Sequence, residues 1–145
     1  MTDLVIDASV AVKWVVPEPD TPAALALRRR YRLVAPNLLV LECANVFWKK
    51  VRRHELTVEE ALISAEAIAQ AGIELSALPK AEAVTRLSLE LDHPAYDCAY
   101  IALALERQCQ FATADRRLIE AIRRSVRRDL DQTVVLFTEL VQQGD

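Results

Sequence analysis

Short apolar runs alternate along this chain with longer segments in which apolar residues recur at helical spacing. Runs with the length and composition of buried strands occur at residues 4–6, 33–35, 73–78, 110–113 and 133–136. Between them, apolar residues recur every three or four positions, as on the buried side of a helix. Strands that alternate with helices form right-handed crossovers and a mostly parallel sheet. The pattern therefore predicts an α/β fold.

Capping and turn residues place the helix boundaries. Ser9 is expected to cap a first helix, and Asn37 a long one that ends near residue 53. Thr57 and Glu60 have the spacing of a capping box, Gly72 suits the end of that helix, and Pro79 suits the first turn of the next. Further helices are predicted at 23–31, from 94, after 115 and from 138. The long helix is expected to supply the core with Leu38, Leu41, Val46, Phe47 and Val51.

Length and composition favour one globular domain that spans residues 1–145. The chain is 52% hydrophobic and 27% charged, which argues against disorder. No apolar run approaches the roughly 18 residues that cross a bilayer, and the first residues lack the pattern of a signal peptide. Cys43, Cys98 and Cys109 show no paired metal spacing and are interpreted as small buried apolar residues. These features predict a cytoplasmic protein.

The charge distribution neither requires nor excludes nucleic-acid binding. The net charge is −3, but basic residues gather at 28–32, 49–53, 116–117 and 123–128. Such runs are most often solvated helix faces, although a negative total is compatible with a local basic rim. His54 and His93 are too isolated to indicate a zinc site or a catalytic triad.

Four acidic residues stand at strand ends or among apolar residues: Asp7, Glu42, Asp97 and Asp115. Parallel sheets bind ligands at the carboxyl ends of their strands, where Asp7 and Asp115 are expected. Converging carboxylates repel one another unless a cation compensates them, and oxygen ligands suit Mg²⁺ or Mn²⁺ better than zinc. Each acid taken singly also fits a helix cap or a favourable partner of a helix dipole. Only their joint placement indicates a metal site.

The segments around these acids resemble the motif blocks of PIN-domain nucleases. The blocks are residues 5–9, the helix that carries Glu42, residues 96–104 and residues 112–118. At this chain length, the sequence is most similar to the VapC-like toxins of VapBC toxin–antitoxin pairs. The resemblance implies a three-layer α/β/α sandwich around a short, mostly parallel sheet of about five strands. It also implies a homodimer and a small VapB-like antitoxin that covers the acidic pocket.

The implied activity is metal-dependent endonucleolytic cleavage of RNA by metal-activated water. Asp7, Asp97 and Asp115 would hold Mg²⁺ or Mn²⁺, and Glu42 would complete the catalytic set. The hydroxyls of Ser9 and Thr113 would support the acids, while Arg116 and Arg117 are candidates for RNA phosphates or are simply surface charges.

The alternatives belong to different functional classes. A catalytically silent PIN-like module that binds RNA or protein would keep the same fold. A phosphatase with an aspartyl-phosphate intermediate would need a second Asp two residues after Asp7, where this chain has Ser9. A receiver-like signalling domain would need paired acids after an early strand and a Lys at a late strand end, and the sequence has neither.

Overall fold

The computed structural model describes residues 1–142 and contains a five-stranded sheet. The strands are β1 (Asp3–Ile6), β2 (Arg32–Pro36), β3 (Glu74–Ser76), β4 (Gln110–Thr113) and β5 (Val134–Leu136). They lie in the order β3-β2-β1-β4-β5, and every neighbouring pair is parallel. The predicted α/β fold with a parallel sheet is confirmed.

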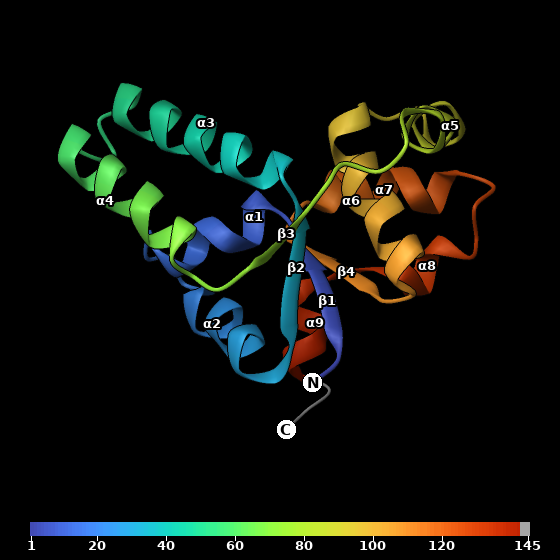
Figure 1. Cartoon of the computed structure of the whole chain (residues 1–145), viewed down its shortest axis with the longest axis horizontal. Coiled ribbons are helices and arrows are strands. Elements are labelled where there is room, and N and C mark those ends of the chain that lie inside the picture. The colour runs from blue at the N-terminus through green and yellow to red at the C-terminus, as the bar shows by residue number, and fades with distance from the viewer. Residues whose placement is uncertain (143–145) are drawn as a thin grey trace.

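Helices cover both sides of this sheet. They are α1 (Ala8–Ala11), the 3₁₀ turn η1 (Val12–Trp14), α2 (Thr21–Arg30), α3 (Leu38–Arg52), α4 (Val58–Ala69), α5 (Ala81–Leu91), α6 (Ala95–Arg107), α7 (Arg116–Arg124), α8 (Leu130–Thr133) and α9 (Phe137–Gln142). Figure 1 shows α1 to α4 on one side of the sheet and α5 to α8 on the other, while α9 packs against α2. This arrangement is the expected three-layer sandwich.

The strand order creates a crevice between β1 and β4. The chain passes from β1 outward to β2 and β3, and then crosses to β4 on the other side of β1. Where the direction of winding reverses in this way, the connections leave the carboxyl ends of two adjacent strands on opposite sides, and a crevice opens between them. Asp7 and Asp115 follow these two strands, so the topology alone brings both acids to the crevice.

A large part of the core lies between the sheet and α6. Leu4, Val5 and Ile6 in β1 are fully buried, as are Tyr100 and Ile101 in α6. Every residue from 98 to 104 is buried because α6 packs across β1, β2 and β4. This central position explains why α6 is apolar around most of its circumference, with Asp97 standing near its beginning.

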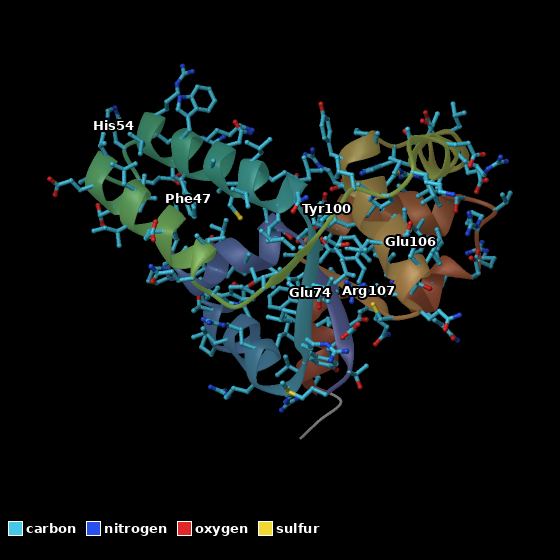
Figure 2. All side chains as sticks on the ribbon, viewed as in Figure 1. Phe47, His54, Glu74, Tyr100, Glu106 and Arg107 are labelled. Atoms are coloured by element: carbon cyan, nitrogen blue, oxygen red, sulfur yellow. The ribbon has the colours of Figure 1, made fainter. Side chains whose placement is uncertain are left out.

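At the amino-terminal edge of the sheet, acidic side chains form ion pairs with basic ones. Asp3 begins β1 and pairs with Arg32 at 2.5 Å and with Arg107 at 3.4 Å. Arg107 also pairs with Glu74, which begins β3, at 2.5 Å, and Figure 2 labels these two side chains next to each other. The positive neighbours hold the pKa of Asp3 below its usual value. This edge therefore has a basic partner for each of its acids.

Several boundary predictions are corrected by the structure. Asp7, not Ser9, is the N-cap of α1, and its carboxylate accepts from the backbone N–H of Val10. Pro79 precedes α5, which begins at Ala81. Leu41, assigned to the core by its spacing, is 70% exposed, whereas Leu39, Cys43 and Phe47 are the buried residues of α3. The capping box of Thr57 and Glu60 is confirmed.

The cysteines behave as the sequence predicts. Cys43 and Cys98 are buried, Cys109 is partly buried, and all three are free thiols. Burial raises the pKa of Cys43 to about 12 and that of Cys98 to about 11, so neither is a ready nucleophile. Across residues 1–142, no helix is long and apolar enough to span a membrane.

Candidate active site

Asp7 is the most buried acid at the carboxyl edge of the sheet. It follows β1 directly and is only 5% exposed. Its two carboxylate oxygens accept hydrogen bonds from the hydroxyls of Ser9 at 2.5 Å and Thr113 at 2.6 Å. Burial raises the pKa of Asp7 to about 7, the nearby Asp97 acts in the same direction, and the two hydroxyls oppose the rise. The charged form of this carboxyl is therefore costly in the absence of a cation.

Ser9 and Thr113 tie the ends of β1 and β4 together. While donating to Asp7, Ser9 Oγ accepts from the backbone N–H of Ala114 at 2.9 Å, and Thr113 Oγ1 accepts from that of Asp115 at 3.0 Å. Thr113 is fully buried behind Asp7. Each hydroxyl thus donates one hydrogen bond to Asp7 and accepts another from the backbone. Together the two hydroxyls hold Asp7 in one orientation.

Asp115 enters the site from the other strand of the crevice. It is the N-cap of α7, and its Oδ1 accepts from the backbone N–H of Arg117 at 2.9 Å. Its side chain also lines the cavity beside Asp7. A capping role and a ligand role are compatible, since the second carboxylate oxygen makes no hydrogen bond to another residue within 1–142.

Glu42 reaches the site from α3. Its Oε1 is buried and has no hydrogen-bond partner in the described chain, and neither has the hydroxyl of Tyr100. Burial raises the pKa of Glu42, Asp97 adds to the rise, and the nearby Tyr100 hydroxyl opposes it. Tyr100 is fully buried and stacks on Phe111 with 5.5 Å between ring centroids. The Tyr100 hydroxyl thus acts directly on the Glu42 carboxylate from the core side of the cavity.

Asp97 comes from α6 and has a partner that sequence reasoning missed. His93 Nε2 lies 2.6 Å from Asp97 Oδ2, and the His93 side chain is only 13% exposed. His93 lies just before Pro94, the N-cap of α6, so its ring contacts the first turn of the helix, where Asp97 stands. The four-residue spacing of His93 and Asp97 was visible in the sequence, but His93 was considered only as a zinc ligand or a member of a catalytic triad.

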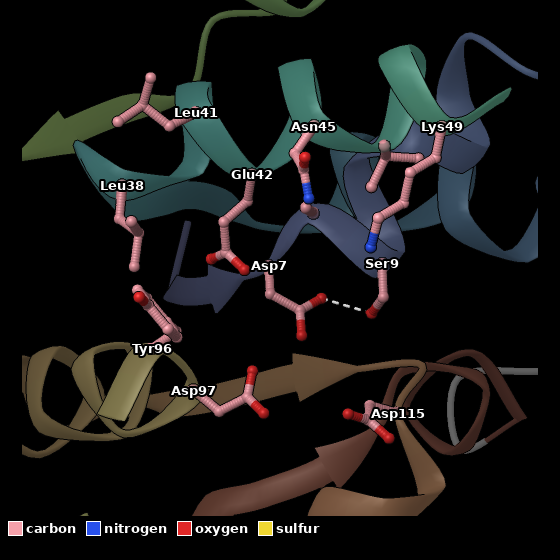
Figure 3. A pocket seen from close by; sticks show the side chains of 12 residues that line it. Asp7, Ser9, Leu38, Leu41, Glu42, Asn45, Lys49, Tyr96, Asp97 and Asp115 are labelled. Carbon is pink, nitrogen blue, oxygen red and sulfur yellow. Dashed lines mark hydrogen bonds between the residues drawn. The ribbon is translucent and has the colours of Figure 1, made fainter. Parts of the chain in front are cut away.

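These side chains converge on one cavity of about 490 Å³ (Figure 3). Its lining includes the predicted residues Asp7, Ser9, Glu42, Asp97 and Asp115, together with Ala8, Leu38, Leu41, Asn45, Val46, Lys49 and Tyr96. Thr113 lies behind Asp7 and is absent from the lining. Arg116 and Arg117 are exposed and do not line the cavity. Sequence reasoning had singled out neither Lys49 nor Tyr96 for the site.

Comparisons with known proteins show the family to which this chain belongs. Residues 4–124 match the model of the PIN domain family. The chain is 34% identical over 121 residues to Ribonuclease VapC3 of Pyrobaculum aerophilum, a match that covers 81% of this chain and 92% of the relative. The chain belongs to the PIN-domain family. The family predicted from the motif blocks is confirmed.

Solved structures support the same PIN fold. PAE2754 from Pyrobaculum aerophilum superposes with a TM-score of 0.73 at 19% identity, over 97% of this chain and 88% of that one. VapC20 of Mycobacterium tuberculosis, a toxin that cleaves the sarcin-ricin loop, gives a TM-score of 0.59 at 13% identity. That match covers 81% of this chain and 94% of VapC20. At these identities the two structures establish the fold alone.

The carboxylates of this PIN domain offer a cation oxygen ligands only. Such a set suits Mg²⁺ or Mn²⁺, which bind a few carboxylates and retain several waters. Among residues 1–142, however, no three His, Cys, Asp or Glu side chains are already close enough to surround one ion directly. The donor chemistry fits a hydrated divalent cation, bound partly through water, and does not fit a closed structural site.

Proposed function

We propose that this protein is a metal-dependent endoribonuclease, the toxin of a type II toxin–antitoxin pair. The observation that carries the proposal is the convergence of Asp7, Glu42, Asp97 and Asp115 on one cavity at the crevice between β1 and β4. The name of the 34% identical relative, Ribonuclease VapC3, supports the same class of activity. Cleavage would hydrolyse a phosphodiester bond within an RNA strand.

In this proposal Asp7, Asp97 and Asp115 hold one or two Mg²⁺ or Mn²⁺ ions, and Glu42 completes the catalytic set. The bound metal supplies an activated water and stabilises charge on the phosphate. The Glu42 carboxylate lines the cavity, where it is available to accept a proton or to orient a water. Ser9 and Thr113 keep Asp7 in place, so that little reorganisation is needed when substrate binds.

Arg116 and Arg117 are proposed to contact phosphates that flank the cleaved bond. Both residues begin α7 directly after Asp115, and both are exposed. Among the described residues, neither guanidinium forms an ion pair. Side chains of this length can extend from the start of α7 toward an RNA strand at the cavity mouth.

The remaining proposals concern assembly and location. We propose a homodimer, a small VapB-like antitoxin as partner, one nuclease domain over residues 1–145, and a cytoplasmic protein. Exposed apolar side chains support the protein partners: Val58, Leu62 and Ile63 on α4 are each more than 60% exposed. Leu41 and Tyr96, 70% and 65% exposed, form an apolar rim of the acidic cavity. Large apolar side chains left in solvent are available for such protein contacts.

Purified protein should cut end-labelled structured RNAs at discrete positions with Mg²⁺ or Mn²⁺ and not with EDTA. Asp97→Asn should lose these cuts because it removes one charge that binds metal. Metal binding without any cut across panels of transfer and ribosomal RNA would favour a silent binding module. Failure to bind metal in titration calorimetry would overturn the proposal.

His93→Ala should weaken both metal affinity and cleavage by about 10–100-fold, the usual cost of losing an outer-shell partner of a metal ligand. The imidazole holds Asp97 in the orientation that faces the cavity. His93→Gln places an amide N–H near the position of Nε2 and should recover most of the loss. Equal metal affinity in the wild-type, alanine and glutamine proteins would exclude this positioning role.

A further inference from the structure

The basic end of α3 continues the lining of the acidic cavity. Glu42, Asn45 and Lys49 point from one side of α3 toward the cavity, as Figure 3 shows. Arg52 and Arg53 follow Lys49 at positions three and four residues later, which places them on the same side of the helix. Trp48, Lys49, Arg52 and Arg53 together line a second recess. Because Lys49 lines both hollows, the recess at the end of α3 adjoins the acidic cavity.

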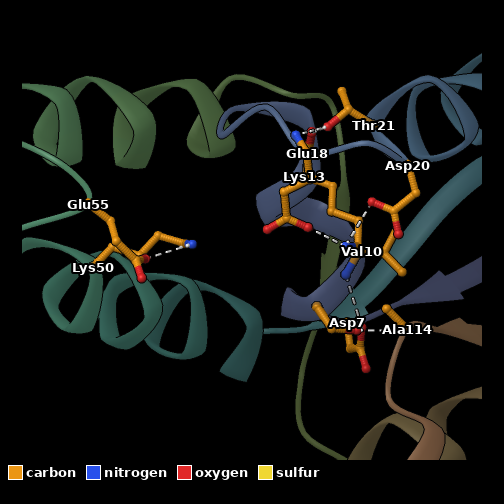
Figure 4. Close-up of polar contacts among 10 residues, drawn as sticks. Asp7, Val10, Lys13, Glu18, Asp20, Thr21, Lys50, Glu55 and Ala114 are labelled. Atoms are coloured by element: carbon orange, nitrogen blue, oxygen red, sulfur yellow. Dashed lines mark hydrogen bonds and ion pairs between the residues drawn. The ribbon is translucent and has the colours of Figure 1, made fainter. Parts of the chain in front are cut away.

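No carboxylate of the described residues pairs with the cations of this recess: none lies within ion-pair distance of Lys49, Arg52 or Arg53. The adjacent Lys50, by contrast, is only 18% exposed and pairs with Glu55 at 3.3 Å (Figure 4). Basic residues at the carboxyl end of a helix interact favourably with the helix dipole. The dipole does not explain why these residues gather around an aromatic ring.

Trp48 is the aromatic ring of this recess, and it is 53% exposed. The guanidinium of Arg52 lies over its indole, with Cζ 5.0 Å from the ring centroid. A large aromatic side chain left half in solvent beside unpaired cations has the chemistry of a surface on which nucleic-acid bases stack and phosphates bind. An apolar partner would find three charges here that no carboxylate pairs, and an acidic peptide would make no use of the solvent-exposed part of the indole.

We propose that the Trp48 platform, defined as Trp48, Lys49, Arg52 and Arg53, binds an unpaired stretch of RNA that extends from the acidic cavity. One base stacks on Trp48, and Lys49 and Arg53 contact the phosphates on either side of it. The inference rests on the proposed function and adds a binding surface for its substrate.

The length of α3 sets the distance between this platform and the cleaved bond. The ten steps along α3 from Glu42 to Arg52 rise about 15 Å. A stacked strand covers this distance in about four nucleotides at roughly 3.4 Å each. The platform therefore selects RNA in which about four nucleotides next to the cleaved bond are unpaired.

The test uses the intrinsic fluorescence of the full chain, which has two tryptophans, in an Asp97→Asn background that prevents cleavage. An unstructured RNA of about twelve nucleotides is titrated. A base on the exposed indole should quench its emission, and Trp48→Leu should remove the quenching and weaken binding about tenfold. Lys49→Gln with Arg53→Gln should lower the slope of log affinity against log salt by about 1.4, for two lost phosphate contacts.

Arg28→Gln is the matched control. Arg28 lies over the other tryptophan, Trp14, with Cζ 5.1 Å from the ring centroid. It does not line the cavity or the recess, so its loss should leave RNA affinity and quenching unchanged.

The outcomes separate this inference from the proposed nuclease function. The inference alone would be overturned if the wild-type protein cleaves RNA, RNA fails to quench the fluorescence of the protein that keeps Trp48, and Trp48→Leu retains full RNA affinity. Loss of antitoxin binding with full RNA affinity in the platform variants would assign the surface to a protein partner and also overturn it. Absence of both RNA binding and cleavage in the wild-type protein would overturn the inference and the proposed function together.

Discussion

Asp7→Asn is expected to abolish metal-dependent RNA cleavage while leaving the fold intact. The substitution keeps the shape of the side chain but removes the charge at the most buried acid of the cavity. An amide can still accept from Val10 N–H and bond to the hydroxyls of Ser9 and Thr113, so the connection between β1 and β4 should persist. Loss of a proposed metal ligand should cost more than the roughly 100-fold that follows loss of an outer-shell partner.

Initial rates of RNA cleavage and the thermal melting temperature should be measured on the same preparation. Asp131→Asn provides a control, because it neutralises an exposed aspartate outside the cavity. The control should cleave at the wild-type rate. Full metal-dependent activity in Asp7→Asn would remove Asp7 from the mechanism, whereas a collapsed melting curve would mean that the carboxylate is needed for folding.

The fold and the two acids that follow strands were predictable because they depend on the order of elements. A buried strand followed by an acid, repeated at β1 and β4, places Asp7 and Asp115 at the same edge of any parallel sheet. The positions of Glu42 and Asp97 were harder to predict, since each projects from a helix whose rotation about its axis is set by tertiary packing. Their polarity within apolar segments was the signal, and the cavity lining includes both.

The errors arise where a tertiary contact overrides a local preference. Ser9 is a good helix cap by composition, yet its hydroxyl is used on Asp7 and on the backbone of Ala114. Leu41 has the spacing of a core residue but is exposed at the edge of the cavity, because α4 and α1 pack against a different side of α3. Lys49 and Lys50 are indistinguishable in the sequence, and only the position of Glu55 separates a paired lysine from a free one.

A further prediction concerns pH, since Asp7 couples stability to protonation. Its pKa is about 7 in the folded protein, against about 3.9 in an unfolded chain. The folded state therefore binds the proton more tightly, and stability falls as pH rises from about 4 to about 7. Above pH 7 the fold retains the full cost of a buried charge. Three units of pKa correspond to about 4 kcal/mol, and structural relaxation should reduce the measured cost to about 2–4 kcal/mol.

The measurement is thermal melting in EDTA at pH 5 and pH 8, for the wild-type protein and Asp7→Asn. Other groups also titrate: the pKa of Glu42 is raised, while those of Asp3 and Asp129 are lowered. The informative quantity is therefore the wild-type value minus the variant value. This difference should become more negative by about 5–10 °C between pH 5 and pH 8. An equal difference at both pH values would show that Asp7 is ionised throughout that range.

Metal binding should offset the destabilisation that ionised Asp7 causes. A cation binds the deprotonated carboxylate, so Mg²⁺ or Mn²⁺ should raise the melting temperature of the wild-type protein more at pH 8 than at pH 5. Asp7→Asn should show little stabilisation at either pH. The burial that makes an unpaired charge at Asp7 costly thus favours a cation at the crevice, whereas the ion-paired acids at the opposite edge of the sheet have no such need.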